Sequence, residues 1–330
     1  MPSQSTLTKA NESVQLEASE RAVVSGGTQG VGAGIALRFA LSGASVWIVG
    51  RSEDKAEALL EKLRAASDEA QRRRSTQQQQ TQADHAFFKA DLSSVKENHR
   101  IAAEISRRAG SRGVDWLFEC QGGPPPLSST KTPTGLDAHF AVQCLSRFTL
   151  AQTLLEAKTI RRGVCIIASP GMGSKTALDV DDLDLSKARE AGKLWAPLGL
   201  LRTGQRDSSI LDAVTQRWAE EHPNMVFSHL FPGIVATDGA KNAGFPWPIP
   251  QLFSVVQKLP LLTSSPLPGG YAEVPFYLYA NSEGQRYQRT GEANLYSPSL
   301  KRLTLSANTS TKEARQTIFD KLKQLESSHA

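Results

Sequence analysis

The amino-acid sequence predicts an α/β fold, in which a doubly wound parallel sheet carries helices on both faces. Two observations lead to this prediction. Short apolar runs alternate along the chain with longer segments of helical periodicity, which is the pattern of successive βα units. The apolar runs are hydrophobic at consecutive positions, as in strands buried on both faces. Since one α/β domain can use most of 330 residues, we expect a single domain over residues 21–304.

The expected elements follow one another along the chain in alternation. Strands are predicted at residues 21–25, 45–50, 86–90, 114–118, 163–168 and 225–231. Helices, with good helix formers and amphipathic spacing, are predicted at residues 31–41, 53–71, 95–109, 135–157 and 207–221. A helix after each strand returns the chain to the same edge of the sheet, as parallel pairing requires.

Four segments stand outside this alternation. Residues 1–20 are polar and are expected to form a flexible tail. Insertions are expected near residues 72–82, which are rich in Arg and Gln, and near residues 238–270, which are rich in Pro and Gly. Residues 305–330 are expected to form a polar C-terminal tail or a helix.

Composition and charge argue against several classes of protein. The net charge of +5 is small and dispersed, so we expect no nucleic-acid partner. No apolar run approaches the about 18 residues of a membrane span, and residues 1–20 lack the features of a signal or transit peptide. We therefore expect a cytoplasmic protein that does not bind membranes. Cys120, Cys144 and Cys165 form no metal-binding motif, so no metal site is expected.

A glycine-rich turn, SGGTQGVG at residues 25–32, separates the first strand from the first helix. Glycine permits the tight turn and lets the backbone approach a pyrophosphate, while the helix N-terminus directs its free N–H groups at the anion. This context predicts a Rossmann-type dinucleotide site. Its expected cofactor-binding residues are Ser25, Gly26, Thr28, Gln29, Gly30, Val31 and Gly32.

This turn resembles the TGxxxGxG fingerprint of the short-chain dehydrogenase/reductase (SDR) family, with Ser25 in the Thr position. Further landmarks appear in the family's order over about residues 20–240. An Asp-Leu pair follows the third strand, CQGG follows the fourth strand where the family has Asn-Asn-Ala-Gly, and PGIVAT resembles the family's PGxxxT after the sixth strand. The resemblance implies cofactor contacts from Asp91, Leu92, Gln121, Gly122, Pro232, Gly233, Val235 and Thr237.

Arg51 directly follows the second strand, where NAD enzymes place an acidic residue. A guanidinium can clamp a 2′-phosphate with two hydrogen bonds, whereas an acid would repel it. Glu53 lies two residues further on and could be mistaken for the NAD-type acid. Arg51 therefore favours NADP(H) as the cofactor.

The family's catalytic pair is missing. SDR oxidoreductases usually place a Tyr and a Lys four residues apart, but none of the five tyrosines here is followed by Lys at that spacing. Counting back from Pro232 puts the two positions near Arg202 and Arg206, and arginine does not donate protons at neutral pH. We expect Arg206 to hold ribose or phosphate oxygens instead.

Two other positions resemble parts of the family's catalytic site. Ser169 keeps the place of the catalytic serine, and Gln143 stands where the family usually has an Asn that organises a water molecule. We expect Ser169 or a water near it to take part in proton transfer. A late tyrosine, Tyr271, is the next candidate.

The sequence therefore predicts an NADP(H)-dependent oxidoreductase that interconverts an alcohol and a ketone on a bulky small-molecule substrate. The divergent landmarks resemble those of SDR members from filamentous fungi, which implies a role in secondary metabolism. The missing Tyr leaves an alternative open, namely an SDR-fold protein that binds the cofactor without redox turnover, as a regulator or a non-redox cyclase or isomerase. A homo-oligomeric state is also left open.

Overall fold

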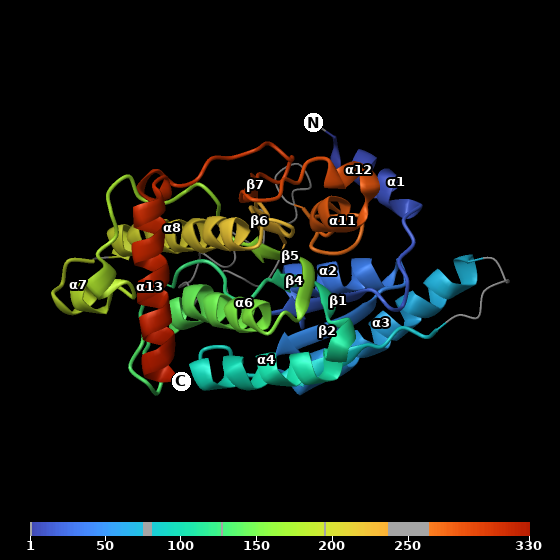
Figure 1. Cartoon of the computed structure of the whole chain (residues 1–330), viewed down its shortest axis with the longest axis horizontal. Coiled ribbons are helices and arrows are strands. Elements are labelled where there is room, and N and C mark those ends of the chain that lie inside the picture. Colours follow the sequence, from blue (N-terminus) through green and yellow to red (C-terminus); the bar gives the residue numbers. More distant parts are fainter. Residues whose placement is uncertain (1, 75–80, 127, 195, 237–263) are drawn as a thin grey trace.

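The computed structural model describes residues 2–74, 81–126, 128–194, 196–236 and 264–330. Its centre is a seven-stranded sheet in the order β3-β2-β1-β4-β5-β6-β7, with every neighbouring pair parallel (Figure 1). The strands are β1 (Arg21–Ser25), β2 (Ser45–Gly50), β3 (Ala86–Lys89), β4 (Val114–Glu119), β5 (Ile160–Ile167), β6 (Val226–Leu230) and β7 (Asn294–Tyr296). The predicted doubly wound parallel sheet is thus confirmed.

Helices cover both faces of the sheet and bury two separate apolar cores. One face carries α2 (Gly30–Ala40), α3 (Glu53–Arg73) and α11 (Glu273–Ala280), whose side chains, such as Phe39 and Phe276, share one apolar core with β1, β2 and β4. The other carries α4 (Val95–Ala109), α6 (Ser146–Glu156), α8 (Ala196–Glu221) and α13 (Lys312–His329). The strand order reverses between β1 and β4, and such a switch point opens a crevice at the carboxyl ends of the strands.

The remaining elements of the described residues are short. They are α1 (Gln4–Glu12), α5 (Ala138–Phe140), α7 (Ser186–Glu190), α12 (Ser282–Gln285), the 3₁₀ turns η1 (Gly110–Arg112), η3 (Val180–Asp182) and η4 (Ala307–Thr309), and one π-helical segment, η2 (Ala141–Leu145). A π-helical segment widens a helix by one residue per turn, and η2 interrupts the long helix expected at residues 135–157 beside the crevice.

The N-terminal segment is a correction to the sequence prediction. Within the expected flexible tail, residues 4–12 form α1, which docks on α11. Asn11 is fully buried and donates through Nδ2 to Glu273 O at 3.0 Å and to Glu273 Oε2 at 2.7 Å. The same carboxylate pairs with Arg38 Nε at 2.9 Å. The partners lie far away in the chain, so the local pattern of residues 1–20 could not reveal them.

The C-terminal half also differs from the expected boundaries. Helix α8 begins at Ala196, eleven residues before the predicted start at 207, and β7 has only three residues, too few for a recognisable pattern. The C-terminal segment forms α13, whose Phe319 ring lies 5.1 Å from Phe148 on α6. Most of the expected insertion at 238–270, and much of that at 72–82, lies outside the described residues.

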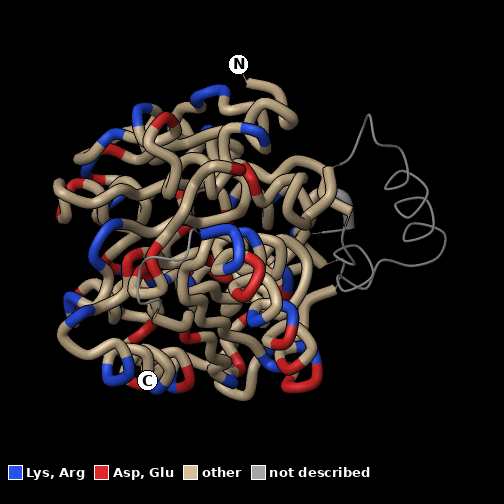
Figure 2. Tube along the Cα trace, turned by 90° about the vertical axis from the view of Figure 1, so that its right-hand side faces the viewer, with Lys and Arg blue, Asp and Glu red and all other residues tan. Residues whose placement is uncertain are grey.

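Charged residues of both signs are interspersed along the surface. Figure 2 shows blue and red segments alternating over the trace, with no continuous basic stripe in this view. Within the described ranges, no helix is both long enough and apolar enough to cross a bilayer. The same ranges hold no cluster of His, Cys, Asp and Glu with the makings of a metal site.

Candidate cofactor and active site

A cavity of about 700 Å³ occupies the crevice at the carboxyl ends of the strands. It extends from the ends of β2 and β3, past the glycine turn after β1, to the ends of β4, β5 and β6. Its size lies within the range of small-molecule and cofactor sites. The cavity is therefore where a dinucleotide would lie across the switch point, with one half on each side.

The glycine turn forms the cavity wall as the sequence predicts for Gly26, Thr28, Gln29, Gly30 and Val31. Gly26 has a φ of +68°, and a Cβ there would lie 2.5 Å from the backbone N of Gln121. Gly30 has a φ of +58° and begins α2, so its turn brings the free N–H groups of the helix to the cavity. This cradle of small residues at a helix N-terminus fits a pyrophosphate.

Two predicted contacts are corrected. Ser25 is fully buried at the end of β1 and does not line the cavity. Gly32 lies inside α2, where a Cβ would come within 2.4 Å of Gly26 O. Both residues therefore shape the turn from behind and do not face a ligand.

The β2–β3 end of the cavity is lined by Arg51, Asp91 and Leu92, three of the predicted cofactor contacts. Ser52 caps α3 by accepting a hydrogen bond from Lys55 N at 3.4 Å, which leaves Arg51 outside the helix at the cavity edge. Glu53 pairs with Lys89, with 3.2 Å between Oε2 and Nζ. Within the described chain Arg51 has no ion-pair partner, so its guanidinium is available to a 2′-phosphate.

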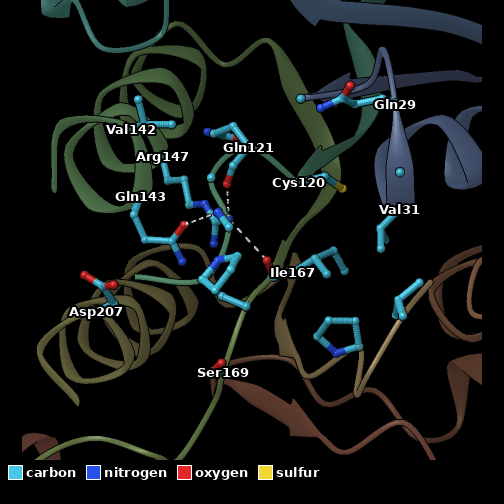
Figure 3. Close-up of a pocket in the computed structure, with 18 of the residues that line it drawn as sticks. Gln29, Val31, Cys120, Gln121, Val142, Gln143, Arg147, Ile167, Ser169 and Asp207 are labelled. Carbon is cyan, nitrogen blue, oxygen red and sulfur yellow. Dashed lines mark hydrogen bonds between the residues drawn. The ribbon is translucent and has the colours of Figure 1, made fainter. Parts of the chain in front are cut away.

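At the β4–β5 end the cavity is lined by Gln121, Gly122, Gln143 and Ser169 (Figure 3). Gln143 comes from η2, and its Oε1 accepts a hydrogen bond from Gly123 N at 3.3 Å. Gly122 has a φ of +101°, and a Cβ there would meet Gln143 Oε1 at 1.8 Å. The turn after β4 and the π-helical segment therefore depend on each other.

The expected role of Arg206 is wrong, because its side chain turns away from the cavity. Its Nη1 donates to Leu183 O at 2.6 Å and its Nε to Asp207 Oδ1 at 2.7 Å. The residues of α8 that line the cavity are Gly204, Asp207 and Ser208. The count back from Pro232 therefore placed the Tyr and Lys positions two residues too early. The two residues that are four apart on α8 and line the cavity are Gly204 and Ser208. Neither position carries a tyrosine or a lysine.

Asp207 is a cavity-lining acid that the sequence analysis missed. Burial by itself would raise the pKa of Asp207, but the charge of Arg206 and the hydrogen bond from His139 hold it below its usual range. His139 Nε2 lies 2.8 Å from Asp207 Oδ2, and Cys144 Sγ lies 3.3 Å from Oδ1. The carboxylate is ionised at neutral pH and does not donate a proton there.

Arg147 is the second residue that the sequence analysis missed. It lies on α6 four residues after Gln143, a spacing that places two side chains on one helix face. Figure 3 shows it reaching between the ends of β4 and β5, where Nη2 donates to Gln121 O and, at 3.2 Å, to Ile167 O. Its side chain is almost fully buried. Behind it, burial raises the pKa of Glu119 to about 8.

The remaining candidates are placed as follows. Of the remaining predicted cofactor contacts, Pro232, Gly233 and Val235 line the cavity, whereas Thr237 lies outside the described residues. Tyr271 is buried among the side chains around α11 and does not line the cavity. Cys120 does line it, and burial raises the pKa of its thiol to about 12, which disfavours the thiolate at neutral pH.

Comparison with known proteins agrees with this geometry. Residues 20–179 match the family model for short chain dehydrogenases. An oxidoreductase of Emericella variicolor is 26% identical over 72% of this chain and 64% of its own length, and a short chain dehydrogenase/reductase of Gibberella zeae is 24% identical over 67% and 60%. The chain thus aligns with slightly less than two thirds of each relative.

Solved structures share the fold. A single-substitution variant of the actinorhodin polyketide ketoreductase, determined with NADPH, superposes with a TM-score of 0.56 over 91% of this chain and 99% of its own, at 18% identity. Family model, fungal relatives and sheet topology agree, while sequence identities are low and the usual helix pair is absent. The matched part of the chain, residues 20–179, belongs to the short-chain dehydrogenase/reductase family, in a divergent form.

Proposed function

We propose that this protein is an NADP(H)-dependent oxidoreductase that interconverts an alcohol and a ketone on a bulky small molecule in fungal secondary metabolism. One observation carries the proposal. A single continuous cavity joins Arg51 at the end of β2 to Ser169 at the end of β5, with the glycine cradle between them. The fungal relatives support the biological setting, and the cytoplasmic location and a homo-oligomeric state stay predictions from the sequence.

The residues along the cavity would divide the cofactor between them. Arg51 would clamp the 2′-phosphate, and Asp91 with Leu92 would border the adenine. The cradle around Gly26 and Gly30 would hold the pyrophosphate. The nicotinamide half would then lie at the carboxyl ends of β4 and β5, beside Gly122 and below Pro232-Gly233, and when bound it supplies or accepts the hydride.

Ser169 and Gln143 carry the proposed proton chemistry. Ser169 lies at the substrate side of the cavity, and its hydroxyl would donate to the carbonyl oxygen that becomes an alkoxide. Gln143 would hold a water molecule that resupplies the proton. Ser208 supports this arrangement, since its Oγ donates to Ser169 O at 2.6 Å and accepts from Met172 N at 2.9 Å, which fixes the serine's backbone.

The rim of the cavity favours an apolar substrate. Four large hydrophobic residues of the described chain are exposed, namely Met172, Leu201, Ile234 and Leu267. Ile234 lines the cavity, and the other three lie one to three positions along the chain from residues that line it. Apolar groups at a cavity mouth bind apolar surface from water, so a bulky hydrocarbon skeleton with one carbonyl or hydroxyl group fits best.

The test is NADPH consumption over a panel of bulky ketones, with the Arg51→Asp variant as the matched control. We expect turnover with at least one polycyclic ketone and strongly reduced turnover in the variant. The observation that Gly204 and Ser208 replace the usual helix pair favours a second candidate, a cofactor-binding protein without redox turnover. Tight NADPH binding with no consumption on any ketone of the panel would support that candidate instead.

A further inference from the structure

We propose that Arg147 makes this site bind the reduced nicotinamide in preference to the oxidised one, and so sets the protein to work as a reductase. This inference rests on the proposed NADP(H) function and deepens it, because it assigns the direction of the reaction to a residue outside the usual helix pair.

The first step is the position of Arg147. Its guanidinium bridges the carbonyl of Gln121, two residues after the end of β4, and that of Ile167, the last residue of the neighbouring parallel strand β5. Arg51 and Asp91 fix the adenosine half at the β2–β3 side of the switch point, so the nicotinamide half lies on the β4–β5 side. Arg147 lines that side of the cavity from below.

The second step is its charge. Arg147 Nε and Nη1 have no hydrogen-bond acceptor in the described part of the chain, and neither oxygen of Glu119 has a donor there. No carboxylate of the described residues lies within ion-pair distance of Arg147, and Asp207 is already held by Arg206 and His139. A guanidinium stays protonated, so the floor of the cavity carries a buried positive charge.

The third step is the difference between the two cofactor states. The oxidised nicotinamide ring carries a positive charge and the reduced ring carries none. A buried cation repels only the oxidised ring, and the low dielectric of a protein interior strengthens that repulsion. If the protein binds the reduced cofactor more tightly than the oxidised one by some factor, the equilibrium between the two bound cofactor states shifts toward the reduced one by that factor.

The reaction balances as a reduction. When bound, the reduced cofactor would supply a hydride, with its two electrons, to the carbonyl carbon, the carbonyl oxygen would take a proton that water resupplies, and the oxidised cofactor would be released. Arg147 itself neither gains nor loses a proton or an electron. Its repulsion lowers the affinity for the oxidised product, which hastens product release and a new turnover in the same direction.

The test compares equilibrium binding of NADPH and NADP⁺ near neutral pH. We expect the wild-type protein to bind NADPH about tenfold or more tightly than NADP⁺. Arg147→Lys keeps the charge and should keep most of this ratio, whereas Arg147→Met should reduce it to about threefold or less. Adenosine 2′,5′-bisphosphate, which lacks the nicotinamide, should bind all three proteins equally.

A second variant covers the case in which Arg147→Met does not fold. The titratable groups facing Arg147 are Glu119 from β4, Cys120 from the following loop, Cys144 from η2, Cys165 from β5, Asp207 from α8 and His229 from β6. Of these groups, Glu119 alone should ionise between neutral pH and a pH of about 9, because its pKa is about 8. The negative charge of ionised Glu119 offsets the positive charge of Arg147, so the ratio of NADPH to NADP⁺ affinity should be smaller at a pH of about 9 than at a pH of about 7. In Glu119→Gln this ratio should not change between the two pH values.

The outcomes separate this inference from the proposed function. If neither NADPH nor the bisphosphate binds, the proposed function is wrong. If both bind but wild type and folded Arg147→Met show the same ratio of NADPH to NADP⁺ affinity, the role of Arg147 is wrong. The role of Arg147 would also be contradicted if the ratio of NADPH to NADP⁺ affinity fell with rising pH in Glu119→Gln as much as in the wild type.

Discussion

The two ends of the crevice are built from different kinds of residue. At the β2–β3 end, short local motifs on β1, β2 and β3 present their side chains and backbone to the cavity as the sequence predicts. At the β4–β5 end, η2, α6 and α8 contribute Gln143, Arg147, Asp207 and Ser208 from distant segments, and the usual Tyr and Lys are missing. The β2–β3 end therefore resembles the family's pattern, whereas the β4–β5 end is rebuilt from other residues.

This difference shows which parts of a site tolerate change. A pyrophosphate and a 2′-phosphate are held by backbone N–H groups, glycine and a guanidinium, and few other residues can serve there. A proton and a carbonyl oxygen can be reached by many groups through water.

The largest effect is expected at the glycine cradle. Gly30→Val should weaken binding of both NADPH and NADH by about 100-fold or more, because a branched side chain at a positive φ would strain the turn and fill the phosphate space. Fluorescence titration measures both affinities. The control is Gly110→Val. Gly110 also has a positive φ, of +59°, but it lies in open space outside the cavity, so this variant should bind both cofactors normally. Normal binding by Gly30→Val would make the turn purely structural.

Cofactor choice should depend on one arginine. Arg51→Asp should weaken NADPH binding by about 2 kcal/mol or more, since it removes a charge-assisted clamp and adds repulsion, and NADH affinity should fall far less or rise. Calorimetry with each cofactor measures the difference. Arg202→Asp makes the same change at an exposed site of α8 outside the cavity and should alter neither affinity. If Arg51→Asp weakened the binding of NADPH and NADH equally, Arg51 would not be the residue that binds the 2′-phosphate.

At the rebuilt end, Ser169→Ala should lower kcat by about tenfold or more, as expected for loss of a group that assists proton transfer. NADPH affinity should stay nearly unchanged, because the serine faces the substrate. Steady-state kinetics with Ser299→Ala, an exposed serine outside the cavity, provides the control. Full activity of Ser169→Ala would reduce the serine to a turn residue.

The buried acid at this end should make stability depend on pH. Burial raises the pKa of Glu119 from 4.5 to about 8, so the folded state retains a proton that the unfolded state releases. This contribution to stability is complete below pH 4.5 and is lost as the pH rises through 8. The free energy of unfolding should fall by ~1 kcal/mol per pH unit in this window, and Glu119→Gln should flatten the slope in urea melts. An equal slope in both proteins would place the acid in water.

The smallest effect concerns the tyrosine suggested as an alternative donor. Tyr271 is buried, and its hydroxyl has no partner among the described residues. Tyr271→Phe should leave kcat unchanged. It should leave the free energy of unfolding unchanged or raise it, by up to ~1 kcal/mol, because it removes a buried hydroxyl without a partner. Tyr279→Phe, which loses a 2.7 Å bond to Val164 O, should lower it by a similar amount. A fall in kcat for Tyr271→Phe would bring that tyrosine back to the chemistry.

How much the sequence could reveal follows the same division between the two ends. The strands, the turn at Gly26 and the position of Arg51 could be predicted because each depends on neighbours in the chain. The phase of α8 could not, since a long loop precedes it and a shift of two residues turns a helix by more than half a turn. That shift alone exchanged Arg206 for Ser208 at the cavity.

The buried polar residues were beyond the sequence for another reason. Arg147 and Asn11 are polar side chains whose partners lie on remote elements, and their residue types are usually exposed. The i+4 spacing from Gln143 was the one available signal for Arg147. Nothing local marked Asn11, whose partner Glu273 lies at the other end of the chain.

The central claim, that the rebuilt end still transfers a hydride, is tested most directly with NADPH carrying deuterium at C4 of the nicotinamide. The protein is incubated with this cofactor and a bulky apolar ketone, and the product is analysed by mass spectrometry. The account predicts an alcohol that has gained one deuterium at the former carbonyl carbon, with far less product for Ser169→Ala. Bound cofactor that keeps its label, with no deuterated alcohol from any ketone tested, would contradict it.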